Sequence, residues 1–385
     1  LPEPSRRMES WRFGTPGNES LENFEAAPPV APEALASIIR EHASMPDAIR
    51  IVYANGLPVS IPEELPEGLA VMDLEDFVLQ YPDAARKHLE TAPETLGSEK
   101  LAALNTALQH NGLVIMADRE ISCPLEIFHF ISGDNVAVFP ATLVIAETGS
   151  RLHILERHVS ADHGSQFCGA LQQHHLSSAS SVKYALVQEL NSRSRAVELC
   201  HIMADDSAEM EHLVSHPGAA WARQETVCLL NGDSANVRLL SASHLKENKE
   251  LDQRTYQKHL YRGASSNLLY VNVLDDEASS IFSGMILVAE GAHDTSAYQS
   301  NRNLSLSPRA EANSIPGLEI LADRVQCSHG SATSSISPEE IFYLLSRGIP
   351  EHTARRMIAQ GFLKHALDQF SDETLRAAVE EIVLS

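Results

Sequence analysis

The stretches NVRLL at residues 236–240 and NLLYV at residues 267–271 decide the fold that we predict for this chain. Each aliphatic run follows the start of a short segment, and such starts recur 13 to 15 positions apart along the middle of the chain. A unit that holds one strand and one turn cannot bury an apolar face alone, so units of this kind must stack. The pattern therefore predicts a β-solenoid in which two units could make one rung. The segment starts are Ser150, Gly164, Ala179, Arg193, Ala208, Trp221, Ala235, Lys249, Ala264, Ala278 and Ala292.

The same region leaves one alternative for the fold. Strands of a β-sandwich also recur at short, regular spacing, so spacing alone does not separate a sandwich from a solenoid. We favour the solenoid and a mainly β fold. The chain then divides into an N-terminal arm with a small α/β region (residues 1–110), a β-helix core (residues 111–336) and a C-terminal helical domain (residues 337–385).

The N-terminal region has a mixed periodicity. Residues 1–30 are rich in Pro, Glu, Ser and Asn, which predicts a loosely ordered arm. Helical spacing follows at residues 33–42 and 98–109, and a strand at residues 49–53 runs into an Asn-Gly hairpin turn at residues 55–56. We therefore expect a small α/β region before the core.

The period becomes helical after residue 336. Ser337, followed by a proline, is placed to cap a helix, and Glu340 three positions on completes a capping box. This helix ends at Gly348, and two more helices are expected at residues 351–370 and 372–383. Since helices of this combined length are too short to form a good core alone, we expect them to pack on the solenoid or on a partner.

The composition excludes several classes of protein. With 52 acidic and 29 basic residues the formal charge is -23, which repels phosphate backbones and anionic membranes. We therefore expect no nucleic-acid partner and no membrane partner. The five cysteines are widely spaced, and no apolar run approaches the roughly 18 residues that span a bilayer. The cysteines indicate a reducing compartment, and the lack of a spanning run indicates a soluble, intracellular protein. We therefore expect it in the cytoplasm or, in a plastid-bearing organism, in the plastid stroma.

The chain also lacks the signatures of common enzymes. It has no Gly-Lys dipeptide, hence no Walker A phosphate loop, and no Gly-x-Gly-x-x-Gly, Gly-x-Ser-x-Gly or His-Glu-x-x-His motif. An enzyme acting on polysaccharides stays open as an alternative, because β-helices often host such enzymes and a hydrolase of this kind needs paired carboxylates. The candidate carboxylates, at residues 205–206 and 275–277, lie where turns are expected.

Histidines and cysteines are the candidate metal ligands. Five histidines crowd one part of the repeat region, and we interpret them as solvent-facing strand residues, with a metal cluster as the alternative. Four cysteines lie in or beside apolar runs, where a free cysteine behaves as a small hydrophobic residue, so we expect them in the core. The histidines are His153, His158, His163, His174 and His175, and the cysteines are Cys123, Cys168, Cys200 and Cys228.

Cys327 and His329 differ from these residues because their neighbours in the sequence are polar. If residues 325–329 form a strand, the two-residue side-chain period puts Val325, Cys327 and His329 on one face. An imidazolium beside a thiol lowers the pKa of the thiol, and a thiolate is the better ligand for a soft metal. Two ligands do not complete an iron–sulfur site, so another subunit would have to supply the others.

Several motifs together resemble the SufB/SufD family of iron–sulfur cluster assembly scaffolds. They are FSG at residues 282–284, DTSAYQSNRN at residues 294–303, CSHG at residues 327–330 and FYLLSRGI at residues 342–349, in the order and spacing of that family. WRFGT at residues 11–15 is similar to an element that the family carries near its N-terminus. The CSHG form is typical of the SufD branch, and the SufB branch is the alternative.

The resemblance implies a right-handed parallel β-helix and a complex of one SufB, one SufD and two SufC ATPases. It implies a non-catalytic scaffold that pairs with SufB through the β-helix and with SufC through the C-terminal helices; a homodimer is the state we consider for the isolated chain. His329 would be a ligand or supporting group at the SufB interface, with Cys327 beside it. No tightly bound cofactor is expected, only transient iron or an iron–sulfur cluster at that interface. The residues expected to contact SufC are Phe342, Tyr343, Arg347, Gly348 and Ile349.

Overall fold

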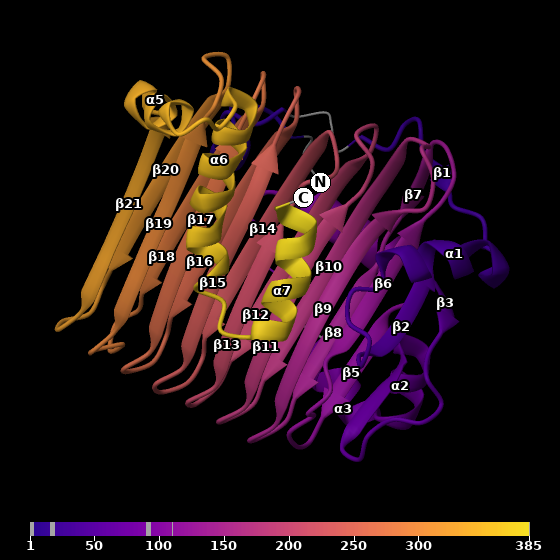
Figure 1. Ribbon diagram of the computed structural model, residues 1–385. Helices are drawn as coiled ribbons and strands as arrows, with labels where there is room; N and C mark the ends of the chain where they lie inside the picture. The colour runs from indigo at the N-terminus through magenta and orange to yellow at the C-terminus, as the bar shows by residue number, and fades with distance from the viewer. Residues whose placement is uncertain (1–3, 16–19, 90–93, 110, 385) are drawn as a thin grey trace.

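The protein is a stack of strands wound between two sheets (Figure 1). The computed structural model describes residues 4–15, 20–89, 94–109 and 111–384, and within them sheet A has 11 strands and sheet B has 10. In spatial order sheet A contains β20 (Glu311–Ile320), β18 (Ser279–Val288), β16 (Glu250–His259), β14 (Trp221–Leu230), β12 (Arg195–Ala204), β10 (Gln166–Leu176), β8 (Ala141–Ala146), β5 (Leu113–Ala117) and β4 (Leu69–Asp73), with β7 (Val136–Val138) beside β10 and β1 (Glu25–Ala26) beside β7. Sheet B contains β21 (Gln326–Ser335), β19 (Ser296–Ser305), β17 (Ser265–Leu274), β15 (Asn236–Leu245), β13 (Glu209–Ser215), β11 (Ser181–Glu189), β9 (Arg151–Ser160), β6 (Leu125–Ile131), β2 (Ile49–Ala54) and β3 (Leu57–Ser60).

The pairing of these strands confirms the β-solenoid. From β8 onward consecutive strands fall in alternate sheets, and each strand pairs in parallel with the strand two elements away. The register advances by 26 residues where Arg195 lies beside Trp221 and by 32 where Ser279 lies beside Glu311. Two of the repeating units therefore make one rung, as the spacing of 13 to 15 positions predicts. The β-sandwich alternative is wrong, because its neighbouring strands would run antiparallel.

The interior between the sheets holds polar as well as apolar side chains. His158 and His174, two of the five clustered histidines, are fully buried there, so the interpretation of the whole cluster as solvent-facing is wrong. The two-residue period separates the faces of a strand but does not say which face is inside. Three of the four cysteines expected in the core are buried, namely Cys168, Cys200 and Cys228, and Cys123 is half-buried.

The N-terminal region is built onto the first rungs. β2 pairs with β6 and β4 pairs with β5, so both sheets continue into this region. β2 and β3 form the expected hairpin, and Asn55 and Gly56 have φ angles of 48° and 79°, the positive values that a tight hairpin turn of this type requires. The helices of this region are η1 (Glu9–Trp11, a 3-10 turn), α1 (Pro32–His42), α2 (Leu74–Gln80), α3 (Pro82–Leu89) and α4 (Glu99–Leu108). Of these, α1 and α4 agree with the helical spacing in the sequence.

The prediction of a loosely ordered N-terminal arm is wrong for the residues that the structure describes. Trp11 is fully buried and stacks on Trp221 of β14, with ring centroids 6.5 Å apart. The guanidinium of Arg223 lies over the same indole ring, 3.9 Å from its centroid. Thr15 donates its N–H and its hydroxyl to the carboxylate of Glu250 at 3.0 and 2.6 Å. The arm is therefore fixed to sheet A by stacking, hydrogen bonds and charge.

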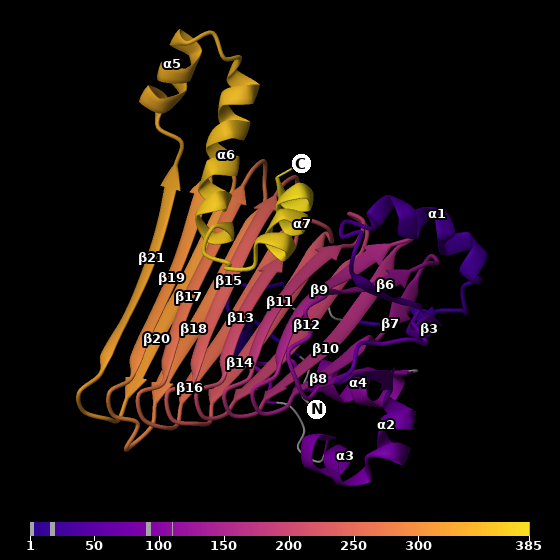
Figure 2. The ribbon, with the colours of Figure 1, turned by 60° about the horizontal axis from the view of Figure 1, so that its bottom comes forward.

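The C-terminal helices pack on sheet B, as expected, with one exception. α6 (Glu351–Leu367) contacts β15 and β17, and α7 (Glu373–Val383) contacts β9, β11 and β15 (Figure 1). Leu363, Phe370 and Leu375 are buried in this contact. α5 (Pro338–Ser346) has no buried residue among its nine and stands beyond the ends of the strands beside α6 (Figure 2).

The start of α5 agrees with the sequence in all but one detail. The Ser337 hydroxyl accepts hydrogen bonds from the N–H groups of Glu339 and Glu340, which confirms Ser337 as the N-cap. The carboxylate that reaches back to the Ser337 hydroxyl, at 2.6 Å, belongs to Glu339. The carboxylate that pairs with Ser337 is therefore that of Glu339, one position earlier than the Glu340 of the expected capping box.

Candidate functional site at the last rung of the solenoid

Cys327 and His329 lie on β21, the last strand of sheet B, so the predicted strand is present. In the parallel register with β19, Cys327 lies beside Ala297 and His329 beside Gln299. Ala297 and Gln299 are buried in the solenoid interior. Because paired residues of neighbouring strands share a face, Cys327 and His329 both face the axis of the solenoid, as the two-residue period predicts. Cys327 packs there with Val325 against the small apolar cluster of the last rungs.

This rung has nothing over it in the part of the chain that the structure describes. β20 and β21 are the edge strands of their sheets at the C-terminal end, and every residue of both is exposed or half-buried. In β19, one rung earlier, the inward-facing residues are buried. His329 therefore faces the axis and yet is exposed to solvent. The open end of the solenoid is a surface on which another protein chain could continue the stack.

The thiol of Cys327 does not have the lowered pKa that the sequence suggests. Partial burial raises its pKa, and this effect outweighs the backbone hydrogen bond at Ala297, which lowers it. Cys327 is therefore a neutral thiol at neutral pH. Among the described residues, neither Cys327 nor His329 belongs to a group of three potential metal ligands that lie close together. A metal at this rung would need ligands from another molecule.

The residues predicted to contact a partner lie on and after α5, at the other end of β21. Phe342 is 72% exposed and Tyr343 is 57% exposed, although both are large hydrophobic residues. The guanidinium of Arg347 lies 5.1 Å from the centre of the Tyr343 ring. Gly348 has a φ of 79°, which lets the N–H of Ile349 reach the carbonyl of Leu344 and ends the helix.

A hollow of about 590 Å³ separates α5 from the ends of β19 and β21. Apolar side chains form much of its lining, so α5 stands off the solenoid without a packed core beneath it. Since strands rise about 3.3 Å per residue, Cys327 lies roughly 26 Å along β21 from this hollow. The structure therefore does not bring the two predicted sets of site residues together. The hollow is lined by Leu306, Pro308, Ile336, Ile341, Phe342 and Leu345, among others.

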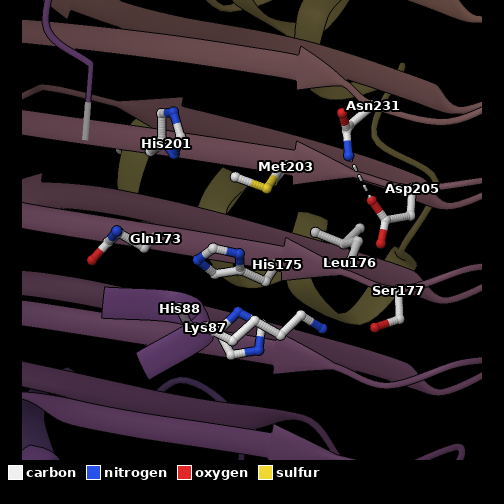
Figure 3. Close-up of a pocket in the computed structure, with 10 residues that line it drawn as sticks. All are labelled: Lys87, His88, Gln173, His175, Leu176, Ser177, His201, Met203, Asp205 and Asn231. Atoms are coloured by element: carbon white, nitrogen blue, oxygen red, sulfur yellow. Dashed lines mark hydrogen bonds between the residues drawn. The ribbon is translucent and has the colours of Figure 1, made fainter. Parts of the chain in front are cut away.

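A second, smaller pocket of about 200 Å³ lies on the outer face of sheet A beneath α3 (Figure 3). His88 of α3 and His175 of β10 meet edge to face there, with ring centroids 4.4 Å apart. Burial lowers the pKa of His88 to about 4 and that of His175 to about 3, so both rings are neutral at neutral pH. His201 of β12 also lines this pocket. Sequence reasoning missed His88 and His201, which lie outside the histidine-rich stretch and reach His175 only through the fold.

Comparison with known proteins assigns the family. The family profile described as "SUF system FeS cluster assembly, SufBD core domain" matches residues 129–362, from β6 through most of α6. The chain belongs to the SufBD family. The matched segment of this SufBD protein includes Cys327, His329 and all of α5.

Individual relatives of this SufBD protein belong to both branches of the family. It is 26% identical to the iron–sulfur cluster assembly protein SufD of Escherichia coli, over 98% of this chain and 87% of that protein. It is 23% identical to SufD of Bacillus subtilis, over 100% of this chain and 89% of that protein. It is also 23% identical to SufB of Bacillus subtilis, over 77% of this chain and 64% of that protein.

No helix in the described part of this SufBD protein combines the length and the apolar character that crossing a bilayer would require.

The acidic pairs that were candidates for glycan hydrolysis lie at turns between strands, at residues 205–206 and 275–277, as expected. Membership of the family agrees with a scaffold in iron–sulfur cluster assembly rather than with that enzyme.

Proposed function

We propose that this SufBD protein is a SufD-type, non-catalytic scaffold that joins a SufB-like chain through its last rung and a SufC-like ATPase through α5. The alignment with SufD relatives runs over nearly the whole chain and over 87% and 89% of the two relatives, whereas it covers 64% of the SufB relative. This difference supports the SufD branch over a SufB-type scaffold. The observation that carries the proposal is the uncovered last rung, whose inward-facing residues include Cys327 and His329.

The edge of β21 is suited to pairing with another strand. Natural sheet edges are commonly protected from such pairing by charged residues, by proline or by bulges. None of the ten residues of β21 is Asp, Glu, Lys, Arg or Pro, so its edge has no such protection. The edge of β20 differs, because it carries Pro316, Glu311 and Glu319. A SufB-like chain would therefore add a strand to sheet B beside β21 and cover the rung.

This arrangement would place Cys327 and His329 inside the joint between the two chains. One thiol and one imidazole are two of the ligands that iron or a nascent iron–sulfur cluster requires, and the partner would supply the rest. Iron and cluster are here the cargo of the assembly. His329 is exposed in the isolated chain, so it can meet the cargo before the joint closes. Cys327, whose thiol is neutral, supports the site and loses its proton only when a metal binds.

The SufC-like ATPase would dock on α5. Exposed apolar surfaces rimmed by polar residues mark protein interfaces, and Phe342 and Tyr343 form such a surface beside the Arg347 guanidinium. α5 is joined to the rest of the molecule by β21 on one side and α6 on the other. A partner that moves α5 therefore pulls directly on the last rung. ATP hydrolysis in the partner would in this way change the joint that holds Cys327 and His329.

Co-expression with SufB-like and SufC-like proteins tests the docking, with point variants rather than a deletion. Removing residues 338–385 would also remove α6 and α7 and expose the buried sheet B residues beneath them, such as Leu240, Leu269 and Val271. Phe342→Asp should instead weaken binding of the SufC-like protein roughly tenfold or more, the effect typical of an interface aromatic residue. Leu79→Asp is the matched control, because Leu79 is also 72% exposed and lies on α2.

A stable three-protein complex that survives Leu79→Asp and loses the SufC-like subunit with Phe342→Asp would support the proposal. The site is tested separately by His329→Ala, which should leave the complex intact and reduce the iron–sulfur cluster formed on it. Full cluster formation by that variant would remove His329 from the mechanism. A chain that binds neither candidate protein would overturn the scaffold role.

A further inference from the structure

Three potential metal ligands meet in the interior of the solenoid, far from the last rung. They are His174 of β10 and Cys200 of β12 in sheet A, and His212 of β13 in sheet B. Their ligand atoms all lie within 4.8 Å of one another, and Cys200 Sγ is 3.7 Å from His212 Nε2. Tetrahedral zinc, with bonds of about 2.0 to 2.3 Å, holds its ligand atoms roughly 3.5 Å apart. Small rotations of these side chains would reach that spacing.

The polar atoms of this group have few partners. All three residues are buried, and neither ring nitrogen of His174 has a hydrogen-bond partner. Nδ1 of His212 also has none. A buried polar atom without a partner is strongly unfavourable, so native proteins nearly always pair such atoms with protein, water or an ion. The unpartnered ring nitrogens, which lie this close to the Cys200 thiol, indicate that a ligand belongs there.

We propose that His174, Cys200 and His212 bind one divalent transition-metal ion of borderline softness, such as Zn²⁺, in the interior of the solenoid. Two imidazoles and one thiolate are a donor set that such ions prefer. Three protein ligands leave one coordination position for a water molecule or another small ligand. The metal would bridge β10 and β12 in sheet A to β13 in sheet B, and so hold the two sheets of adjacent rungs together.

The electrostatic surroundings of the three ligands favour a cation. Glu156 and Glu198 are buried nearby, and although burial raises their pKa values, hydrogen bonds and charge from neighbouring histidines lower both to about 2. Both carboxylates are therefore ionised. Burial raises the pKa of Cys200 well above its ordinary value, and the charges of Cys228 and of the two carboxylates add to this. The negative charges of Glu156 and Glu198 make a thiolate at Cys200 unfavourable, and the positive charge of a bound metal ion would compensate for them.

The two histidines of the group are ready to act as ligands. Burial lowers the pKa of His212 to about 4 and lowers that of His174 well below its ordinary value, so both rings are neutral and keep a free lone pair at neutral pH. Metal binding would replace the thiol proton of Cys200, which is released to solvent. Uptake of the metal should therefore weaken as pH falls.

A neighbouring group in the same interior has more of its polar atoms paired, although both ring nitrogens of His129 also lack a hydrogen-bond partner. His129, Glu156 and His158 also lie close together, but Glu156 already accepts hydrogen bonds from the His158 ring at 2.9 Å and from the Tyr184 hydroxyl at 2.6 Å. Burial lowers the pKa of His158. The interaction with Cys168 and the hydrogen bonds to carboxylates outweigh burial and raise this pKa well above its ordinary value. A protonated ring has no lone pair for a metal. The group around Cys200 is therefore the metal site of the two.

The test uses the full-length protein, purified without chelator, with Zn²⁺ and Co²⁺ as the probes. We expect one metal ion per chain at saturation, and a melting temperature that rises with the concentration of Zn²⁺. The Co²⁺ form should show the intense visible bands of a tetrahedral site and a thiolate-to-cobalt charge-transfer band. Cys200→Ala should abolish that band and the metal-dependent rise in melting temperature. Cys228→Ala is the matched control, because Cys228 is also buried in the interior and belongs to neither group of potential ligands.

The result that would overturn the proposal is also specific. Less than one tenth of an ion per chain after incubation with Zn²⁺, or a Co²⁺ spectrum without a thiolate band, would mean that buried water satisfies these rings instead. The zinc content and the cobalt spectrum are both measured on the unmodified chain, so these two tests hold even if Cys200→Ala fails to fold. Loss of the metal in His175→Asn but not in Cys200→Ala would move the site to the outer pocket of Figure 3 and refute it too. None of these outcomes depends on the docking partners proposed above.

Discussion

The indole rings of Trp11 and Trp221 lie nearly parallel, with an interplanar angle of 8° and their centroids 6.5 Å apart. Trp11 also donates its ring N–H to the carbonyl of Gly97 at 2.9 Å. One side chain of the N-terminal arm thus joins β14 in the middle of sheet A to the segment before α4. The arm is a structural part of the solenoid.

Trp11→Ala should therefore destabilise the whole protein. Removing a fully buried tryptophan typically costs about 3–5 kcal/mol, from lost burial and from the cavity that remains. The free energy of unfolding in guanidinium chloride measures this loss. Phe13→Ala is the control, because Phe13 lies two positions away and is 44% exposed, and its effect should stay below about 1 kcal/mol. Equal effects of the two variants would show that the stacking contributes nothing.

The charges beneath this contact form a second test. Asp252 accepts hydrogen bonds from the buried guanidinium groups of Arg223 and Arg254. Asp252→Ala leaves two buried cations without their shared carboxylate, and breaking a buried pair in this way costs about 3–5 kcal/mol. Chemical denaturation measures the loss. Asp47→Ala, in an exposed turn, also removes a carboxylate and should change stability by less than about 0.5 kcal/mol.

The buried histidines predict how stability depends on pH. Burial is the main cause that lowers the pKa of each of four histidines outside the proposed metal site to about 4, namely His88, His129, His244 and His259. Between pH 6.5 and 4 the unfolded chain binds protons at these positions and the folded chain does not. Stability should therefore fall as pH falls through this window, by up to about 1.4 kcal/mol per pH unit for each histidine.

His259→Gln should make that decline less steep, because glutamine does not titrate. The measurement is the free energy of unfolding at a series of pH values from 7 to 4, for both proteins. His158 contributes with the opposite sign, since its pKa is raised: its stabilisation is present below pH 6.5 and is lost only as pH rises through the folded value. A flat profile from pH 7 to 4 would contradict the burial of these neutral rings.

The unprotected edge of β21 predicts association through that strand. Ser328 pairs with the exposed Tyr298, so both side chains lie on the outer face of sheet B. Ser328→Lys therefore places a positive charge on the outer face of the edge strand β21. This variant should weaken pairing with a SufB-like chain, and any dimer that the isolated chain forms, roughly tenfold or more, because a lysine on an edge strand opposes strand addition. Analytical ultracentrifugation measures both.

The control for that experiment is Asn313→Lys, on the edge of β20. Asn313 pairs with Ile281 and is half-buried. The lysine of this variant adds the same charge at the neighbouring edge of the same rung. If Asn313→Lys weakens association as much as Ser328→Lys, pairing does not run through β21.

The repeats in the sequence predicted the solenoid because each unit carries its own strand and turn. Runs such as residues 236–240 alternate with turns at a regular spacing, and this local pattern is enough to set the rung. The hairpin at Asn55 and the cap at Ser337 were also predictable, because both depend on residues only a few positions apart. Local physics determined these parts of the fold.

Contacts between distant segments were not predictable in the same way. Trp11 meets Trp221 only after the rungs have stacked, and nothing near Trp11 in the sequence records that contact. His174 and His175 are adjacent, yet one faces the interior and the other faces the outer pocket under α3. Alternation predicts that they face opposite sides. Which of them lies inside is set by the stacking of the rungs, which also brings Cys200 and His212 to His174.

The uncovered last rung has a consequence for how the molecule opens. Each rung of a solenoid is held mainly by its immediate neighbours, so its stability is close to that of a one-dimensional chain of coupled units. A terminal unit has one neighbour where an inner unit has two, and β21 lacks even the buried inner face that β19 has. The strand that carries Cys327 and His329 should therefore be the first to fray, and its amide hydrogens the first to exchange. Whatever binds there would act as the cap of the repeat array and set how far along the solenoid such opening can spread.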